Sequence, residues 1–230
     1  MLDRPRTRSA AAWAFAALAL AGCSNDPNRI NYRSVVSGVA AQFGGTLPFD
    51  GKTAGARQAQ SLAAPSVILA QTEAPVILVQ PQNGAGPFYI VGIRDNGPWR
   101  TYATGARQTL VLRQGVVTAT RGLGGDLMAS DIDPMLELLR ANRAGKARRV
   151  MQVLDGEDVT RQIALDCTLS VGTQVRTTTG IAGRAMTEDC ASDDLSFRNS
   201  YVVDRAGNAL QSDQWLPTSQ GRLTLTVLRP

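Results

Sequence analysis

The chain has 230 residues, of which 43% are hydrophobic and 19% are charged, so its composition excludes wholesale disorder. It contains no histidine, which excludes Ser-His-Asp and Cys-His nucleophilic catalysis, histidine-ligated metal sites and a histidine pH switch. The formal net charge is +5, but the arginines are scattered and no nucleic-acid-binding motif accompanies them. We therefore expect no nucleic-acid partner, no metal and no cofactor.

The N-terminus has the pattern of an export signal. A basic segment, Arg4–Arg8, precedes the apolar run Ala10–Leu20, which is shorter than the about 20 residues of a membrane-spanning helix. Leu20–Cys23 has the sequence Leu-Ala-Gly-Cys and resembles a bacterial lipobox, whose cysteine is acylated and becomes the new N-terminus. We expect a signal peptide over 1–22, a lipidated tether over 23–28 and one domain over 29–230. The alternative is an ordinary signal peptide with an incidental cysteine.

Acylation of Cys23 predicts stable attachment to membrane lipid, because its acyl chains exceed the two signals that stable anchoring requires. Ser24, rather than an aspartate, follows the cysteine. By resemblance to enterobacterial sorting rules, this residue favours the outer membrane. We therefore expect a lipid-anchored protein of the outer membrane that faces the periplasm.

Two cysteines remain after Cys23, namely Cys167 and Cys190. An even remainder in an exported chain predicts a disulfide. This bond would close a loop of about two dozen residues and contribute about 3 kcal/mol in the chain-entropy model. Two buried free thiols are the alternative, and the spacing excludes a Cys-x-x-Cys redox pair.

Helical spacing appears first near the N-terminus and again in mid-chain. Tyr32, Val36, Val39 and Phe43 share one helical face, which predicts a short helix closed by Gly44-Gly45. We interpret 46–64 as a long connection. A second short helix opens with Asp133 as N-cap and Pro134 at the first helical position, and Gly145 closes it. Its inner face comprises Met135, Leu138 and Leu139.

Between and after these helices, short segments rich in Val, Ile and Thr alternate with Gly, Asn, Asp and Pro turns, which predicts strands. Strands and helices do not alternate, which argues against a parallel α/β sheet. We predict a mainly β fold, an antiparallel meander that forms a barrel-like or sandwich domain. The expected strands are 65–71, 75–80, 87–94, 98–104, 108–113, 115–121, 148–154, 161–170, 173–181, 185–190, 196–204, 209–216 and 222–228.

Several motifs could have either a chemical or a purely structural role. Gly122–Asp126 is glycine-rich, but it lacks the spacing and the following lysine of phosphate-binding loops, so we interpret it as a tight turn. Paired carboxylates could serve a glycosidase or bind calcium, yet adjacent aspartates are usually solvated turn residues, and the calcium-loop pattern is missing. We predict no catalytic residue among them. The pairs are Asp131/Asp133, Glu188/Asp189 and Asp193/Asp194.

Aromatic residues in the expected strands could stack on sugars. With only 5% aromatic residues, such a β protein normally uses these rings in its core, and we weigh both roles. The candidates for glycan or partner contact are Trp99, Tyr201 and Trp215; Tyr102 lies in a strand as well.

Several blocks of the sequence resemble the YjbF/GfcB family of lipoproteins, in the order found in that family. Besides the lipobox, they are Ala74–Val79, the strand of Trp99, Thr118–Leu127, Asp133-Pro134, Asn199–Asp204, Gln214–Pro217, Gly221–Leu225 and Leu228–Pro230. The resemblance implies a mainly β, barrel-like fold and an association with exopolysaccharide or group 4 capsule operons. It implies no catalytic residue. Many members have Tyr-Trp-Val-Asp where this chain has Tyr201-Val-Val-Asp204, which weakens the case for a sugar platform on this strand.

Three functions remain open at this point. The first is a non-catalytic, lipid-anchored accessory protein in exopolysaccharide or capsule secretion or assembly, with polysaccharide or polysaccharide-export proteins as partners. The second is a polysaccharide-modifying enzyme. The third is a structural envelope protein that binds other secretion components.

Overall fold

The computed structural model describes residues 62–230 except 124, 155–158 and 218–220. Cys23, the tether and the helix expected around Tyr32–Phe43 lie outside the described residues. So do 46–61, the greater part of the expected connection.

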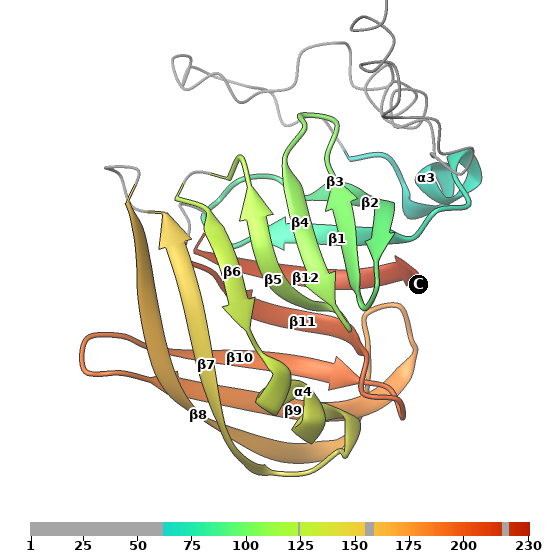
Figure 1. The fold of residues 1–230 in the computed structure, drawn as a ribbon. Helices are drawn as coiled ribbons and strands as arrows, with labels where there is room; N and C mark the ends of the chain where they lie inside the picture. Colours follow the sequence, from blue (N-terminus) through green and yellow to red (C-terminus); the bar gives the residue numbers. More distant parts are fainter. Residues whose placement is uncertain (1–61, 124, 155–158, 218–220) are drawn as a thin grey trace, which may run out of the picture. The chain divides into compact units, whose positions relative to one another are not determined.

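The described residues form a twelve-stranded antiparallel sheet that curls into a nearly closed barrel (Figure 1). The strand order is β5-β4-β3-β2-β1-β12-β11-β10-β9-β8-β7-β6. Neighbours in sequence are thus neighbours in the sheet, except β5 and β6, which stand at its two ends. In addition, the first strand pairs with the last. The strands are β1 Val76–Pro81, β2 Phe88–Asn96, β3 Trp99–Ala103, β4 Thr109–Arg113, β5 Val116–Arg121, β6 Leu127–Asp131, β7 Gly145–Leu154, β8 Thr160–Arg176, β9 Ala182–Ala191, β10 Ser196–Val203, β11 Ala209–Trp215 and β12 Arg222–Arg229.

The β4–β5 turn shows how local sequence sets the strand register. Gln114 and Gly115 have φ angles of 50° and 81°, and Arg113 pairs with Val116. A two-residue turn with both φ angles positive matches the natural twist of a hairpin. Gly115 is also required for packing, because a Cβ there would lie 2.4 Å from the carbonyl oxygen of Ala209 on β11.

Side-chain hydrogen bonds join β5 to β6, the two strands at the ends of the sheet order. Thr120 donates to Asp126 at 3.0 Å and accepts from the Leu127 amide at 3.0 Å. The Asp126 carboxylate also accepts from the amides of Gly122 and Leu123, at 2.8 and 3.1 Å. Asp126 therefore holds Gly122 and Leu123 in place after β5.

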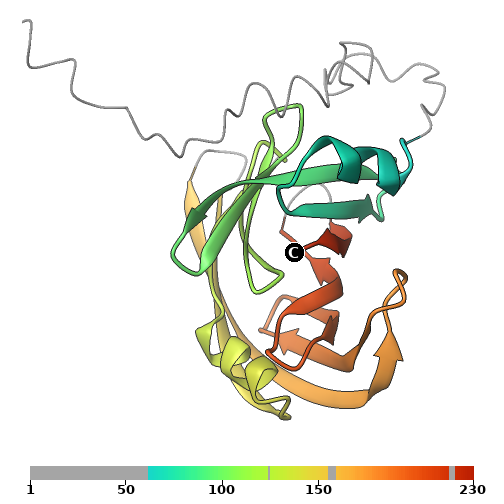
Figure 2. The same cartoon turned by 90° about the vertical axis from the view of Figure 1, so that its right-hand side faces the viewer.

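Two apolar clusters fill the interior. The first is built from strands and includes Ile90, Leu110, Met151 and Leu223. The second forms around α4 (Asp133–Arg140), which buries Met135, Leu136, Leu138 and Leu139. Figures 1 and 2 show α4 beside β7 at one end of the curved sheet.

The expected strand at 65–71 is wrong. The segment Pro65–Gln71 is the helix α3, with Pro65 in its first turn. Proline suits that place because the first amides of a helix have no intrahelical acceptor. Of the described residues in α3, only Ile68 is buried, and it packs with Val76 and Tyr89 in a small cluster.

Other elements also differ from the expectation. The expected strands 161–170 and 173–181 are one strand, β8, whose register with β9 shifts between Val171 and Gln174. Strand β6 was not expected at all. The N-cap of α4 is Ile132 rather than Asp133, and the helix ends at Arg140 rather than near Gly145.

The end of α4 has a local cause. Asn142 has a φ of 46°, and its amide bonds the Leu139 carbonyl at 3.0 Å, while the Arg143 amide bonds the Leu138 carbonyl at 3.0 Å. This pair of bonds is the Schellman pattern, in which asparagine can replace the usual glycine.

Candidate functional site

A buried ion pair lies inside the barrel. Arg149 on β7 and Glu188 on β9 are 1% and 0% exposed, and Arg149 Nη1 lies 2.9 Å from Glu188 Oε2. Two groups of β10 donate to the same carboxylate oxygen: Asn199 Nδ2 at 2.8 Å and the Tyr201 hydroxyl at 2.7 Å. The negative charge of Glu188 is thus held by three donors, as a buried carboxylate requires. We call Arg149, Glu188, Asn199 and Tyr201 the interior network.

The interior network connects strands rather than facing solvent. Arg149 Nε donates to Ser130 on β6 at 3.3 Å, and Asn199 Oδ1 accepts from the backbone amide of Trp215 on β11 at 2.8 Å. Burial, together with the charge of Glu188, raises the pKa of Tyr201 well above its ordinary value. Tyr201 therefore remains a neutral donor at physiological pH.

The interior network resembles a catalytic constellation in residue types but not in access. Each of its four residues is at most 2% exposed, and a catalytic group must touch its substrate. The arrangement therefore serves the fold. Sequence reasoning treated Glu188 as a turn residue; the available signal was strand alternation, which places Met186, Glu188 and Cys190 on one face.

Cys167 on β8 lies directly opposite Cys190 on β9, and a disulfide joins them. Within the described part of the chain, the two cysteines and Glu188 form a group of side chains close enough together to hold a metal, with all ligand atoms within 4.8 Å of one another. The two sulfur atoms are bonded to each other, so they supply no thiolate for a metal. The group is a disulfide beside a carboxylate that Arg149 already neutralises.

The three aromatic candidates lie in different environments. Trp99 is 40% exposed, and the Arg113 guanidinium lies 5.1 Å from the centre of its ring. Trp215 is half-buried and stacks on Phe197 with ring centres 4.8 Å apart. Tyr201 belongs to the interior network. The structure therefore does not bring these three rings together as a platform, and Trp99 is the exposed one.

The aspartates singled out in the sequence have contacts typical of turns and surfaces. Asp131 accepts from the amide of Asp133 at 3.2 Å, and Asp133 pairs with Arg113. Asp189 pairs with Arg198 at 2.6 Å. Asp193 and Asp194 are exposed between β9 and β10.

A cavity of about 840 Å³ lies near the end of α4. Its lining comes from the connection after the helix (Asn142), the distal part of β8 (Gln174), the start of β9 (Ala182–Arg184), and the end of β10 with the turn that follows it (Val203–Ala206). This volume falls in the range of about 300–1,000 Å³ that is usual for small-molecule sites. Sequence reasoning had no signal for it, because its walls are distant in the chain.

No helix in the described part of the chain is both long enough and apolar enough to cross a membrane. A comparison with curated proteins finds no match. Among solved structures, the hypothetical lipoprotein YmcC from Escherichia coli (K12) is similar, with a TM-score of 0.64 and 19% sequence identity. The similarity covers 73% of this chain and 89% of that chain, and at this identity it supports the barrel fold alone.

The group 4 capsule polysaccharide lipoprotein family, GfcB or YjbF, matches residues 35–228. The match contains all twelve described strands but for the last residue of β12. It also agrees with the sequence blocks that resemble this family, including Thr118–Leu127 and Gln214–Pro217. The chain therefore belongs to the group 4 capsule polysaccharide lipoprotein family.

Proposed function

We propose that this protein is a lipid-anchored, non-catalytic accessory protein in exopolysaccharide or capsule secretion or assembly at the outer membrane. Family membership over residues 35–228 is the observation that carries the proposal. In this proposal, 1–22 is a removed signal peptide and acylated Cys23 with the tether 23–28 holds the domain 29–230 at the membrane. Its partners are polysaccharide or polysaccharide-export proteins on the periplasmic side.

The geometry supports a non-catalytic role. Hydrolysis of a glycosidic bond uses two carboxyl groups about 5–10 Å apart that the substrate reaches. Glu188 is closed inside the interior network, while Asp133 and Asp189 are occupied by arginine partners. Asp126 is engaged in its turn. These contacts favour a scaffold over an enzyme.

Single substitutions of aspartate by asparagine, with exopolysaccharide measured at matched protein level, test this proposal. We expect graded losses that follow the stability of each variant, because a positioned acid or base would instead contribute about 10²–10⁴-fold. A variant that is folded, abundant and completely inactive would favour the polysaccharide-modifying enzyme. The variants are made at Asp126, Asp131, Asp133, Asp189, Asp193 and Asp194.

A pulldown with the full chain distinguishes the accessory role from a purely structural one. The bound material is scored separately for glycan and for protein. Glycan, or an export component that carries glycan, supports the proposal. Envelope proteins without either would indicate a structural protein that binds other secretion components.

A further inference from the structure

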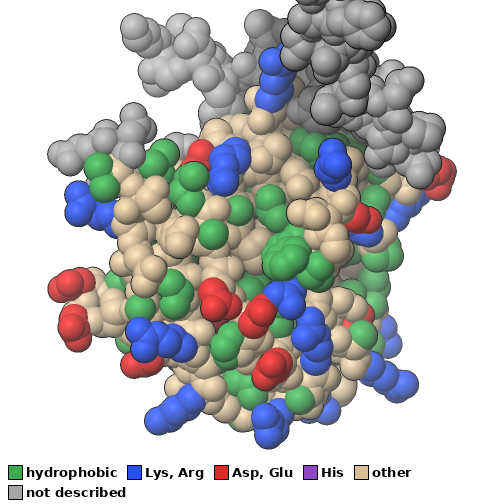
Figure 3. Space-filling view, in the orientation of Figure 1, with side chains coloured by type: hydrophobic (Ala, Val, Ile, Leu, Met, Phe, Trp, Pro, Cys, Tyr) green, Lys and Arg blue, Asp and Glu red, His purple; other side chains and the backbone are tan. Residues whose placement is uncertain are grey.

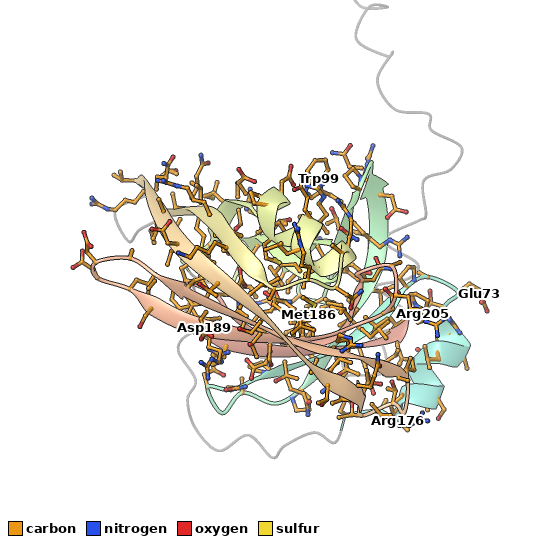
Figure 4. The ribbon with its side chains drawn as sticks, turned by 90° about the horizontal axis from the view of Figure 1, so that it is seen from below. Glu73, Trp99, Arg176, Met186, Asp189 and Arg205 are labelled. Atoms are coloured by element: carbon orange, nitrogen blue, oxygen red, sulfur yellow. A yellow bond between two sulfur atoms is a disulfide. The ribbon has the colours of Figure 1, made fainter. Side chains whose placement is uncertain are left out.

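Two arginines line the cavity near the end of α4, and neither has a carboxylate partner among the described residues. Arg184 donates to the carbonyl oxygen of Gly172 at 3.1 Å, which leaves its charge uncompensated. Arg205 is exposed in the β10–β11 turn. Figure 4, seen from below, labels Arg205 on the same side as both Arg176 and Glu73. The lining of the cavity therefore holds two arginines and one carboxylate, that of Asp204.

The carboxylate in the lining, that of Asp204, is already engaged in hydrogen bonds within its own turn. Its Oδ1 accepts from the amides of Ala206 and Asn208, each at 2.8 Å, and its Oδ2 accepts from Asn208 Nδ2 at 2.9 Å. The carboxylate thus holds the turn that carries Arg205. An anion entering the cavity meets two guanidinium groups and a carboxylate that is already hydrogen-bonded.

Two glycines hold the cavity walls in close contact. At Gly207 a Cβ would lie 2.6 Å from the Cα of Arg140, so the β10–β11 turn packs directly on the end of α4. At Gly183 a Cβ would lie 2.7 Å from Cγ1 of Val202, so β9 packs closely on β10. Closely packed walls hold a site in place before binding, which reduces the entropy lost on association.

We propose that this cavity binds an acidic sugar unit of a glycan, one that carries a carboxylate. A planar guanidinium matches a carboxylate with two parallel hydrogen bonds. Ala182 and Ala206 supply small apolar contacts for the face of a sugar ring, and Asn142 and Gln174 supply amides for its hydroxyl groups. The lining contains no lysine. This inference rests on the proposed function, in which polysaccharide is the material handled.

Space-filling Figure 3 shows Lys and Arg side chains over much of the lower part of the face it views, interspersed with Asp and Glu. Charge alone therefore does not define the site. The cavity differs from the surrounding surface because it combines a fixed concave wall with two arginines that lack carboxylate partners.

Calorimetric titration of the full chain in non-ionic detergent tests the proposal with three probes. Tetragalacturonate carries carboxylates, maltotetraose is a neutral sugar of equal length, and glycerol 3-phosphate represents a lipid headgroup. We expect tetragalacturonate to bind, more weakly at high salt, and the other two to bind at least about tenfold less tightly. Arg205→Gln and Arg184→Gln should each weaken tetragalacturonate binding about 10–100-fold, the range of a charged hydrogen bond. Arg94→Gln, at an exposed arginine on β2, is the matched control and should bind like the wild type.

Equal affinity for maltotetraose, equal weakening by Arg94→Gln, or no binding of tetragalacturonate would each overturn the inference. Preference for glycerol 3-phosphate would assign the cavity to a lipid headgroup and would overturn it as well. Exopolysaccharide measured in a deletion strain separates this outcome from the proposed function. If the probes fail while deletion abolishes exopolysaccharide, only the cavity inference falls; if the probes bind while deletion changes nothing, only the proposed function falls.

Discussion

At the residue scale, Arg149 and Glu188 show how the barrel interior accommodates charge. Removing one partner of a buried ion pair costs about 3–5 kcal/mol, because the remaining charge has no compensation. Arg149 Nη2 has no hydrogen-bond partner in the described part of the chain. Glu188 therefore supplies most of the compensation for this guanidinium, with the ring of Phe197 at 5.9 Å.

We expect Glu188→Gln to lower the free energy of unfolding by about 3–5 kcal/mol, because glutamine keeps the shape and removes the charge that faces Arg149. Arg149→Met should cost a similar amount. The double variant should lose clearly less free energy of unfolding than the two single variants together, because it leaves no unpaired charge in the interior. Urea unfolding followed by tryptophan fluorescence measures these differences. Additive losses would show that the two charges do not stabilise each other.

At the element scale, the β10–β11 turn depends on a glycine for two separate reasons. Gly207 has a φ of 82°, and a Cβ there would approach the backbone of Arg140 on α4. Gly84, between β1 and β2, has a similar φ of 86° but no atom within 4 Å of an added Cβ. A comparison of substitutions at Gly207 and Gly84 therefore separates the cost of backbone strain from the cost of steric overlap.

We expect Gly84→Ala to lower the free energy of unfolding by about 1 kcal/mol, the cost of a positive φ in alanine. Gly207→Ala should cost about 2–4 kcal/mol, because the overlap with α4 adds to the same strain. Thermal unfolding of both variants beside the wild type measures the difference. Equal effects would mean that the turn does not pack on α4 as closely as the structure shows.

The hairpin of β8 and β9 carries the disulfide, which closes a sequence separation of 23 residues. We expect the denatured, unreduced full chain to bind no thiol reagent, because acylation occupies Cys23 and the other two cysteines are joined. After reduction, mass spectrometry should find two modified cysteines, Cys167 and Cys190. Modification of both before reduction would contradict the disulfide and the exported compartment together.

Individual elements show which features sequence patterns can predict. Most strands follow from short segments rich in Val, Ile and Thr between turn residues, because that signal is local. The same signal misassigned Pro65–Gln71, since a short run of Val, Ile and Leu suits a strand or a helix, and here proline in the first turn favours the helix. The expected break between 161–170 and 173–181 is likewise absent, because β8 continues through this point with a shift of register.

At the scale of the whole molecule, the antiparallel meander with a barrel-like form was predictable, and the pairing of the first strand with the last was not. Pairing of β1 with β12 joins residues near opposite ends of the domain, such as Val79 and Leu225. The interior network and the arginine-lined cavity likewise assemble from distant strands. Strand alternation marks only Glu188 of the network, and the cavity leaves no local pattern, so one sequence alone indicates the fold class but not these sites.

The proposed membrane attachment through Cys23 concerns the whole molecule, since it would determine where the barrel acts. We expect Cys23→Ala to abolish incorporation of labelled palmitate and to leave an uncleaved or soluble product, because the thiol that receives the lipid is absent. A double variant, Cys167→Ala with Cys190→Ala, is the matched control. This variant lacks the other two cysteines but keeps Cys23, so it should still incorporate labelled palmitate.

Fractionation alone does not decide the question, because an uncleaved signal peptide is itself apolar and holds a precursor at the membrane. The palmitate label is therefore the decisive measurement, and fractionation is read beside it. If Cys23→Ala still incorporates palmitate and still sediments with membranes, the lipid is attached elsewhere and the anchor assigned to Cys23 is wrong. If the label is lost while exopolysaccharide production is unchanged, the protein acts without its anchor, and the proposed function must then rest on the barrel alone.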